Sequence, residues 1–531
     1  MPYATLFNRL PPKPLGSLNL LVRRYTAAAA AMSSTTTHYA AVVIGSGQGG
    51  TPLSMAFAQA GHKTALIESV HVGGCCVNEG CTPTKTMIAS GRVAYLARRG
   101  NDYGVSTVGG SGSGGRNEVH VAMEKVRQRK RDMVDSFRSG SERRVRDAGV
   151  ELIRGAASFR DDRTLCVRPG ADGSAETTLT ADRIFICTGE RPASPRIDGF
   201  DAASFPPGVV LDSTSVQELG EVPSHLVVVG GGYIGLEFGQ LFRRLGAEVT
   251  ILQRGKQLLP REDPEVAEAM LKIVREDGIR VLLNTSPTAV RPGSGSGDQS
   301  AAVVSVSTTA SGPDAELRGS HVLFAAGRVP NTDGLDLAAA GIETTPRGHV
   351  KVDAQLRTSN PRVWALGDVK GPPAFTHVSY DDFRLLRANL LLGDDKATTT
   401  TGDTPPLTTE GRILPYVVYT DPQLGHVGLH EHEARRDLPP SGRTIQVANM
   451  PMSYVARALE TGETRGLMKA VVDADSQQIL GFTCLGLEGG EVMSVVQMAM
   501  IGRVKWTALR EAVWAHPSLA ESLNNLWGFL K

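Results

Sequence analysis

The sequence contains no long hydrophobic run, since none reaches the ~18–20 apolar residues that a transmembrane helix needs. Cysteine is scarce, with six in 531 residues, so the fold does not depend on a set of disulfides. Charge is balanced, because 56 basic and 55 acidic residues leave a formal net charge of +1. We therefore expect neither a membrane nor a nucleic acid as a partner.

Acidic residues are missing from the start of the chain, where the first carboxylate is Glu68. Residues 1–38 instead carry arginine, lysine and many serine, threonine and alanine residues. This composition is typical of a mitochondrial transit peptide, although a disordered tail has it too. We predict that residues 1–38 are one or the other and that the protein enters mitochondria. Translation from Met32 would give a cytoplasmic form.

Two of the six cysteines, Cys76 and Cys81, lie in the glycine-rich string GGCCVNEGCTPTK at residues 73–85. The Thr-Pro pair after Cys81 predicts a helix start with Thr82 as the N-cap. A helix N-terminus favours the thiolate form of a nearby cysteine, and Lys85 adds a positive charge in the first turn. The string therefore predicts a redox-active dithiol. On these two residues alone a structural disulfide or a zinc site remains open.

A zinc site usually takes three or four ligands from paired clusters. The sequence has no second cysteine or histidine pair with that spacing. We therefore predict no resident metal.

Two glycine-rich turns each follow a short buried strand and open a helix, as in a dinucleotide-binding unit. In such a unit the first glycine makes the tight turn, the second lets the backbone approach a pyrophosphate, and the third allows close packing of helix on strand. Glu68 ends the strand after the first unit, where an acid binds a ribose hydroxyl. The six glycines are Gly45, Gly47 and Gly50 in the first turn and Gly230, Gly232 and Gly235 in the second.

The repeat also bears on the choice of nicotinamide cofactor. The offset of 23 residues from Gly45 to Glu68 leads from Gly230 to Gln253, which is not an acid. Arg254 and Lys256 follow. An acid would repel the 2′-phosphate of NADPH, whereas a neutral residue beside arginine accepts it. We predict that the second unit prefers NADPH, with NADH possible, unless both cations are simply solvated loop charges.

The complete string Gly-Gly-x-Cys-x-Asn-x-Gly-Cys-x-Pro-x-Lys resembles the active-site segment of the flavin-dependent pyridine nucleotide-disulfide oxidoreductases. This is the family of glutathione reductase, lipoamide dehydrogenase and mercuric reductase, and the chain looks closest to a mercuric-reductase-like branch. One departure is Cys75, where family members commonly carry Thr. The resemblance implies FAD at the first unit, directly before the dithiol. It also implies that electrons pass from NADPH through FAD to a Cys76–Cys81 disulfide, with Cys81 against the flavin and Cys76 facing the substrate.

The resemblance implies further residues at the two cofactors. Lys85 is expected to pair with Glu237 beside the flavin. Tyr233 is expected to cover the flavin's nicotinamide side, unless it is only a packed aromatic ring. The remaining matches to the family's flavin-binding motifs are Gly74, Thr188, Gly189, Gly327 and Asp368.

Near the end of the chain, His516 and Glu521 resemble the family's His-Pro-Thr-x-x-Glu motif. In the family the histidine reaches the dithiol of the partner subunit and the glutamate orients its ring. An imidazole can exchange protons with thiols near neutral pH. The resemblance thus implies a homodimer.

We predict an α/β fold with two Rossmann-like dinucleotide-binding domains and a C-terminal α/β dimerisation domain. The predicted segments are 39–205 and 329–393 for FAD, 206–328 for NAD(P), a polar linker at 394–411 and the dimerisation domain at 412–531.

We expect the electron acceptor to be a small-molecule disulfide or a metal ion. Lipoamide dehydrogenase, a mercuric or copper reductase, and a non-catalytic redox-sensing flavoprotein remain alternatives. The C-terminal cysteine pair of true mercuric reductases is absent, since the last cysteine is Cys484.

Overall fold

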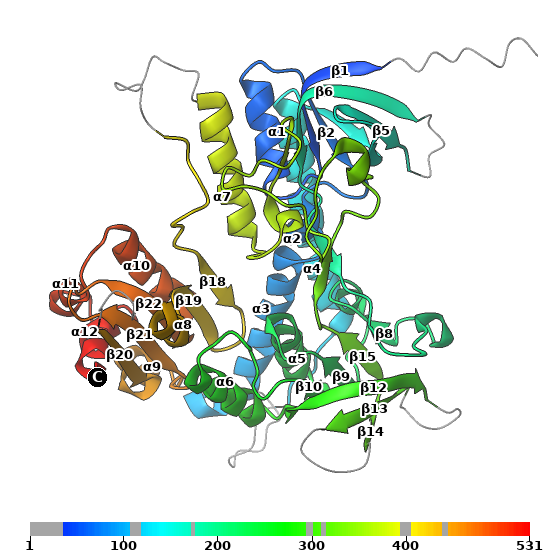
Figure 1. Cartoon of the computed structure of the whole chain (residues 1–531). Coiled ribbons are helices and arrows are strands. Elements are labelled where there is room, and N and C mark those ends of the chain that lie inside the picture. Colours follow the sequence, from blue (N-terminus) through cyan, green and yellow to red (C-terminus); the bar gives the residue numbers. More distant parts are fainter. Residues whose placement is uncertain are drawn as a thin grey trace, which may run out of the picture.

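The computed structural model describes residues 36–106, 118–170, 176–293, 301–308, 315–392, 405–437 and 444–531. Most of the predicted segments 1–38 and 394–411 therefore lies outside the described residues. Two sheets with helices on their faces lie one above the other along a pair of long helices, and a third α/β unit lies beside them (Figure 1). The predicted α/β class with two nucleotide units and a C-terminal domain is confirmed. The exact domain boundaries stay predictions.

The first unit is a seven-stranded sheet in the order β3-β2-β1-β6-β5-β4, with β17 also paired to β6. Its elements are β1 (Thr37–Ile44), α1 (Gly50–Gln59), β2 (Thr64–Glu68), β3 (Glu151–Arg154), β4 (Ala156–Phe159), β5 (Thr164–Arg168), β6 (Thr177–Ile186), β17 (Val363–Ala365) and α7 (Thr376–Arg387). Strands β1, β2, β3, β6 and β17 run parallel to one another. Strand β5 pairs antiparallel with both β6 and β4. The centre of β1 is apolar and buried because the sheet is covered on both faces.

The second unit repeats this plan in a five-stranded parallel sheet of order β11-β10-β9-β15-β8. A three-stranded antiparallel sheet, β12-β13-β14, packs its valines against β9. Its elements are β8 (Val210–Leu211), β9 (His225–Val229), α5 (Tyr233–Leu245), β10 (Glu248–Leu252), α6 (Pro264–Glu276), β11 (Arg280–Leu282), β12 (Thr285–Pro292), β13 (Ala302–Thr308), β14 (Ala315–Gly319) and β15 (His321–Phe324).

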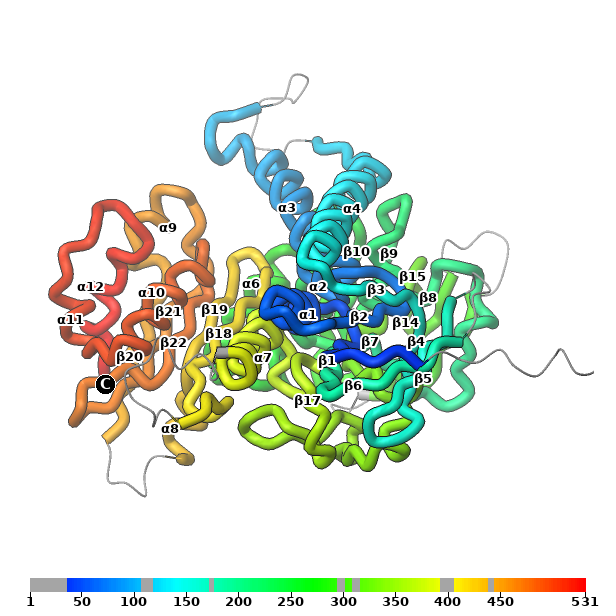
Figure 2. Tube along the Cα trace, turned by 90° about the horizontal axis from the view of Figure 1, so that it is seen from above, coloured from blue at the N-terminus to red at the C-terminus, as the bar shows by residue number. Residues whose placement is uncertain are grey.

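The chain passes between the two units twice, on β7 (Glu190–Pro192) and β16 (Arg328–Pro330), which pair antiparallel. Beside this crossing lie the short helix α2 (Gly74–Asn78) and two long helices, α3 (Cys81–Arg98) and α4 (Met123–Asp147) (Figure 2). Helix α3 packs against both α4 and α5. It therefore carries the dithiol segment from the first unit to the second.

The start of α3 differs from the prediction. The helix begins at Cys81 with Gly80 as its N-cap, so the expected capping role of Thr82 is wrong. Cys76 lies in α2, a helix that the sequence pattern did not indicate. The tight return between α2 and α3 relies on Gly80, where a Cβ would lie 3.0 Å from the carbonyl oxygen of Cys75.

The C-terminal unit is a five-stranded antiparallel sheet of order β18-β19-β22-β21-β20 with its own apolar core. Its elements are β18 (Pro415–Val418), β19 (Gln423–Gly428), α8 (Glu431–Asp437), β20 (Ile445–Pro451), α9 (Ala456–Glu460), β21 (Leu467–Asp473), β22 (Ile479–Gly486), α10 (Gly489–Ile501), α11 (Trp506–Glu511) and α12 (Ser522–Leu526). Helix α10 covers β19 and β22.

Candidate active site

The two glycine turns have the same geometry. A Cβ on Gly50 would lie 2.1 Å from the carbonyl oxygen of Gly45, and one on Gly235 would lie 2.0 Å from that of Gly230. Gly45 and Gly230 have φ angles of +100° and +121°, which L residues rarely adopt. Only glycine therefore lets α1 and α5 start so close to the preceding strand, and the sequence repeat is also a structural repeat.

The first turn has the features of a nucleotide cradle. A Cβ on Gly47 would meet no atom within 4 Å, so the backbone there is open to a ligand. Gly74, with φ of +64°, packs onto this turn, and a Cβ on it would lie 2.5 Å from the Cα of Gly47. The hydroxyl of Thr188 is buried without a hydrogen-bond partner among the described residues. A bound dinucleotide can satisfy that hydroxyl, so the residues present fit FAD.

The other predicted flavin-site residues gather around the crossing of β7 and β16. Gly189 precedes β7 and Gly327 precedes β16, and a Cβ on either residue would meet no atom within 4 Å. Asp368 lies just beyond β17, and burial raises the pKa of its carboxyl above the usual range. The structure therefore brings these residues to one side of the dithiol segment.

The second turn is open in the same way as the first, since a Cβ on Gly232 would meet no atom within 4 Å. Arg254 and Lys256 are exposed just after β10, and neither makes a hydrogen bond or ion pair with another described residue.

Tyr233 begins α5. The residue is 40% exposed, and its ring centroid lies 6.3 Å from that of Phe375.

The side chains of Cys76 and Cys81 lie within hydrogen-bonding reach of each other across the turn between α2 and α3. The Cys81 sulfur also lies 3.4 Å from the hydroxyl oxygen of Thr376. The bond from Cys76, the Thr376 hydroxyl and the Lys85 charge together lower the pKa of Cys81 to about 6. The bond to Cys81 and burial raise the pKa of Cys76. At neutral pH Cys81 is thus the thiolate and Cys76 holds the proton.

Lys85 and Glu237 meet across the two units. The Lys85 ammonium lies 2.7 Å from one carboxylate oxygen of Glu237, whose side chain is only 5% exposed. The other carboxylate oxygen accepts a hydrogen bond of 2.8 Å from the backbone N–H of Tyr419. The Lys85 ammonium also lies 4.9 Å from the centre of the Tyr419 ring. This set joins the dithiol helix α3, helix α5 and the C-terminal domain.

Cys75 occupies a position where family members commonly carry Thr. Its sulfur lies 3.5 Å from a guanidinium nitrogen of Arg328 at the crossing of the two units. Burial raises the pKa of Cys75 to about 11, despite the lowering effect of Arg328. Cys75 is therefore a neutral thiol that contacts Arg328.

His516 and Glu521 lie together at the far end of the C-terminal domain. The Nδ1 atom of His516 is 3.0 Å from each carboxylate oxygen of Glu521, and the histidine side chain is 68% exposed. Neither residue contacts Cys76 or Cys81 of the same chain. The pair is thus preformed and open to a partner.

A comparison with protein families matches the pyridine nucleotide-disulphide oxidoreductase model to residues 39–382. The dimerisation domain of the same family matches residues 414–526. The chain belongs to this family. Its predicted class, an FAD-dependent oxidoreductase that uses NAD(P)H, is confirmed.

Relatives in this family cover almost the whole chain. The probable pyridine nucleotide-disulfide oxidoreductase RclA of Escherichia coli K12 is 34% identical over 494 residues, which are 92% of this chain and 99% of the relative. The mercuric reductase of Bacillus cereus is 31% identical over 483 residues, which are 91% and 70% of the two chains. A solved Cu(II) complex of RclA, an HOCl-induced flavoprotein disulfide reductase from Escherichia coli, has a TM-score of 0.78 at 32% identity and covers 93% of this chain and all of that one.

The predicted mitochondrial location is wrong. These relatives in the disulfide oxidoreductase family come from bacteria, which have no mitochondria. Basic, hydroxyl-rich composition also occurs in unstructured tails, so it does not specify import. Across the described part of the chain, no helix is both long and apolar enough to span a bilayer.

Several contacts at the dithiol were missed from the sequence. Thr376 and Tyr419 lie more than 200 positions from the cysteine string and belong to no motif of their own. Arg328 lies in the stretch GRVPNT at residues 327–332, which resembles a family motif but does not indicate a contact with Cys75. These three side chains contact the string only because the two nucleotide units and the C-terminal domain close around it.

Proposed function

We propose that the protein is an NADPH-dependent disulfide reductase in which the Cys76–Cys81 pair reduces a small-molecule disulfide. The observation that carries this proposal is the placement of Cys81 at the first position of α3, with its sulfur 3.4 Å from the Thr376 hydroxyl and the Lys85–Glu237 pair one turn along the helix. FAD and NADPH, when bound, supply the two electrons that reopen the Cys76–Cys81 disulfide after each turnover. The roles of the chain's own residues follow from the contacts around the two sulfurs.

Cys76 is the attacking residue in this account, and it must first lose the proton that it shares with Cys81. Its sulfur then attacks one substrate sulfur, so that a mixed disulfide forms and one thiol leaves. The Cys81 thiolate next attacks the Cys76 sulfur, which closes the Cys76–Cys81 disulfide and releases the second product as a thiolate that takes its proton from solvent. Two electrons leave the protein pair, and the substrate disulfide becomes two thiols. Thr376 and Lys85 keep Cys81 charged for the second step.

His516 supplies the proton transfer in this sequence. It takes the Cys76 proton and returns it to the first leaving thiolate, while Glu521 at 3.0 Å fixes the ring. His516 does not contact the dithiol of its own chain, so the partner subunit must provide it. We therefore propose a homodimer with two shared sites, and the presence of the family's dimerisation domain supports this assembly.

NADPH is the proposed electron donor because Gln253 stands where an acid would repel a 2′-phosphate and because Arg254 and Lys256 are exposed beside it. Gly232 leaves the backbone of the second turn open to the pyrophosphate. Tyr233, at the start of α5, is proposed to cover the nicotinamide side of the site.

Reduction of Cu(II) is a second candidate, because RclA has been solved as a Cu(II) complex. In that reaction the dithiol gives one electron to each of two Cu(II) ions and releases the Cys76 proton, so no proton has to be delivered to a leaving group. The preformed His516–Glu521 pair therefore favours the disulfide.

The test is NADPH oxidation by the purified flavoprotein with a panel of small disulfides, Cu(II) and Hg(II). Turnover with a disulfide that produces two thiols per NADPH is expected. Turnover with metal ions alone would replace this proposal by the second one.

A further inference from the structure

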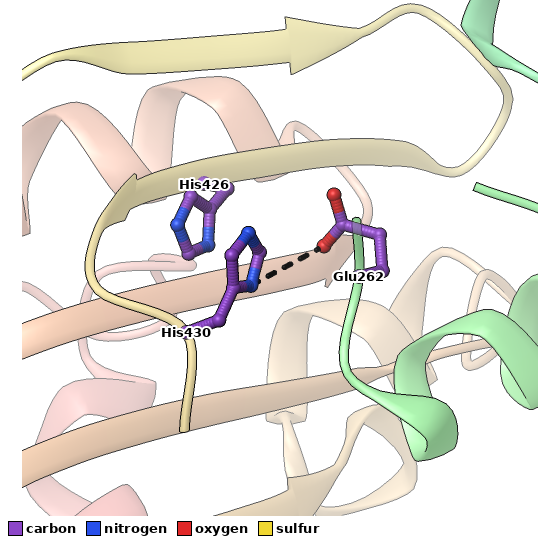
Figure 3. Close-up of side chains that lie close together, drawn as sticks. All are labelled: Glu262, His426 and His430. Atoms are coloured by element: carbon purple, nitrogen blue, oxygen red, sulfur yellow. Dashed lines mark ion pairs between the residues drawn. The ribbon is translucent and has the colours of Figure 1, made fainter. Parts of the chain in front are cut away.

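Three buried side chains with metal-binding chemistry meet between the second nucleotide unit and the C-terminal domain (Figure 3). Glu262 lies just before α6, His426 lies on β19, and His430 lies just before α8. One ligand atom from each residue lies within 4.8 Å of the other two, and within the described ranges no other group of three does so. All three side chains belong to residues that are at most 6% exposed.

The hydrogen bonds around His430 leave one of its nitrogens bare. The Tyr416 hydroxyl donates its hydrogen to Glu262 Oε1, so its oxygen can only accept from His430 Nε2, 3.3 Å away. A neutral His430 then has a lone pair on Nδ1. That atom points at Glu262 Oε2 across 4.0 Å, and both atoms are buried without a hydrogen-bond partner. Two facing acceptors of this kind need a proton, a water molecule or a cation between them.

His426 can complete the site by changing its tautomer. Its ring stacks on that of His430 with centroids 3.8 Å apart, and its nitrogens contact the Thr483 hydroxyl at 2.7 Å and the Gly428 carbonyl oxygen at 3.1 Å. If Nδ1–H donates to Thr483, then Nε2 gives up its donation to the Gly428 carbonyl oxygen and carries the lone pair that an ion needs. A donated ring N–H of this kind is the usual support of a metal-bound histidine.

We propose that Glu262, His426 and His430 bind one Zn²⁺ ion, with water as the fourth ligand. Two imidazoles and one carboxylate form a ligand set that zinc uses, whereas Mg²⁺ and Ca²⁺ prefer oxygen alone. At zinc bond lengths the ligand atoms of a tetrahedral site lie about 3.3 Å apart. The Glu262–His430 separation of 4.0 Å is close to this value. The His426 ring, stacked on His430 with an interplanar angle of 11°, must turn for its lone pair to point at the same ion.

The nearby charges leave the Glu262 carboxylate available. Lys469 is fully engaged, since its ammonium lies 2.9, 2.6 and 2.7 Å from carboxylate oxygens of Asp263, Glu265 and Glu431. His432 is also directed to Asp263, at 2.9 Å, and its side chain is 52% exposed. Neither side chain pairs with Glu262.

The proposed ion joins two parts of the chain that are far apart in sequence. Glu262 belongs to the second nucleotide unit, and both histidines belong to the C-terminal domain. Tyr416 connects this site to the active site, because its ring stacks on Phe375 at 5.7 Å and 4°, and Phe375 precedes the Cys81 contact Thr376. We therefore place a structural zinc ion at the domain junction behind the dithiol.

The test measures zinc in untagged, flavin-replete protein in its oxidised form, so that Cys76 and Cys81 are not available as thiolates. After equilibration with micromolar zinc sulfate and gel filtration, mass spectrometry of the metal should give one zinc per chain. X-ray absorption should show two imidazoles, and the thermal unfolding midpoint should rise with zinc. Glu262→Gln and His430→Asn should each weaken binding at least 100-fold in competition with a chromophoric chelator.

His432→Asn is the matched control, since His432 stacks 5.4 Å from His430 but binds Asp263. It should bind zinc within threefold of the wild type. The proposal is overturned if the wild type retains no zinc or if absorption shows sulfur ligands. It is also overturned if both site variants, with normal flavin content, bind zinc as the wild type does.

Discussion

Gln253 occupies the place in the second nucleotide unit that Glu68 occupies in the first. The Glu68 carboxylate accepts the backbone N–H of Ser46 at 3.1 Å, and the Gln253 side-chain oxygen accepts that of Gly231 at 3.2 Å. Ser46 and Gly231 each follow the first glycine of their turn. The two side chains are therefore structural equivalents, and the second unit carries a neutral amide where the first has a negative charge.

This equivalence predicts the cofactor preference. Gln253→Glu should lower kcat/KM for NADPH by about tenfold or more while sparing NADH, because the new carboxylate repels the 2′-phosphate. Arg254→Ala should also lower kcat/KM for NADPH selectively. Steady-state kinetics with both cofactors is the measurement, and NADH serves as the internal control. Equal losses of kcat/KM with NADPH and NADH would show that these residues do not contact the 2′-phosphate.

The Thr376 hydroxyl should set the pKa of Cys81. In the wild type the thiolate persists above a pH of about 6 and is lost on acidification, because a lowered pKa favours the charged form of a thiol. Thr376→Val should move this titration upward by about one unit through loss of the hydrogen bond. Alkylation rates of the reduced protein against pH measure the change. Thr376→Ser keeps the hydroxyl and should titrate like the wild type.

The Lys85–Glu237 pair should show strong coupling in stability. Lys85→Met leaves the buried Glu237 carboxylate without its cation and should lower the free energy of unfolding by about 2–3 kcal/mol. Adding Glu237→Gln removes the stranded charge and should restore part of the loss. Urea unfolding of both single variants and the double variant completes the cycle. Additive effects would mean that the contact contributes nothing to the fold.

His516 should be needed for reduction of the substrate disulfide and not for reduction of the protein by NADPH. His516→Ala should slow disulfide turnover by about 10²–10⁴-fold, while single-turnover reduction by NADPH stays close to the wild-type rate. Glu521→Gln should give a smaller loss, because it disturbs only the ring orientation. Mixing His516→Ala chains with Cys76→Ser chains tests the shared site. Recovery of activity in the mixture is expected of a dimer that exchanges subunits, and inactive mixtures that contain proven heterodimers would refute it.

The two nucleotide units and the dithiol could be predicted from the sequence, because each is encoded by residues that are close together in the chain. The glycine turns, the strand before each and the cysteine string each lie within about thirty residues, and dinucleotide units have that length. The contact between Lys85 and Glu237 spans 152 positions, yet the family resemblance indicated it. The family resemblance includes both Lys85 and Glu237, so it indicates their contact although they are far apart in the sequence.

Other features could not be predicted because no local pattern encodes them. Thr376 contacts Cys81 across 295 positions, and Glu262 meets His430 only where two domains join. The sequence predicts an N-cap at Thr82 because Thr-Pro is a strong helix signal, but the N-cap of α3 is Gly80, two residues earlier. The spacing of cysteine and histidine along the chain predicts no metal site, and the proposed zinc site, assembled from distant segments, has no such spacing.

Anaerobic titration with NADPH, followed by alkylation and peptide mass spectrometry, tests the central claim most directly. The oxidised protein should hold one disulfide, between Cys76 and Cys81, and one equivalent of NADPH per chain should free both thiols and no others. An unchanged thiol count at these two positions, with the flavin bound, would contradict the account.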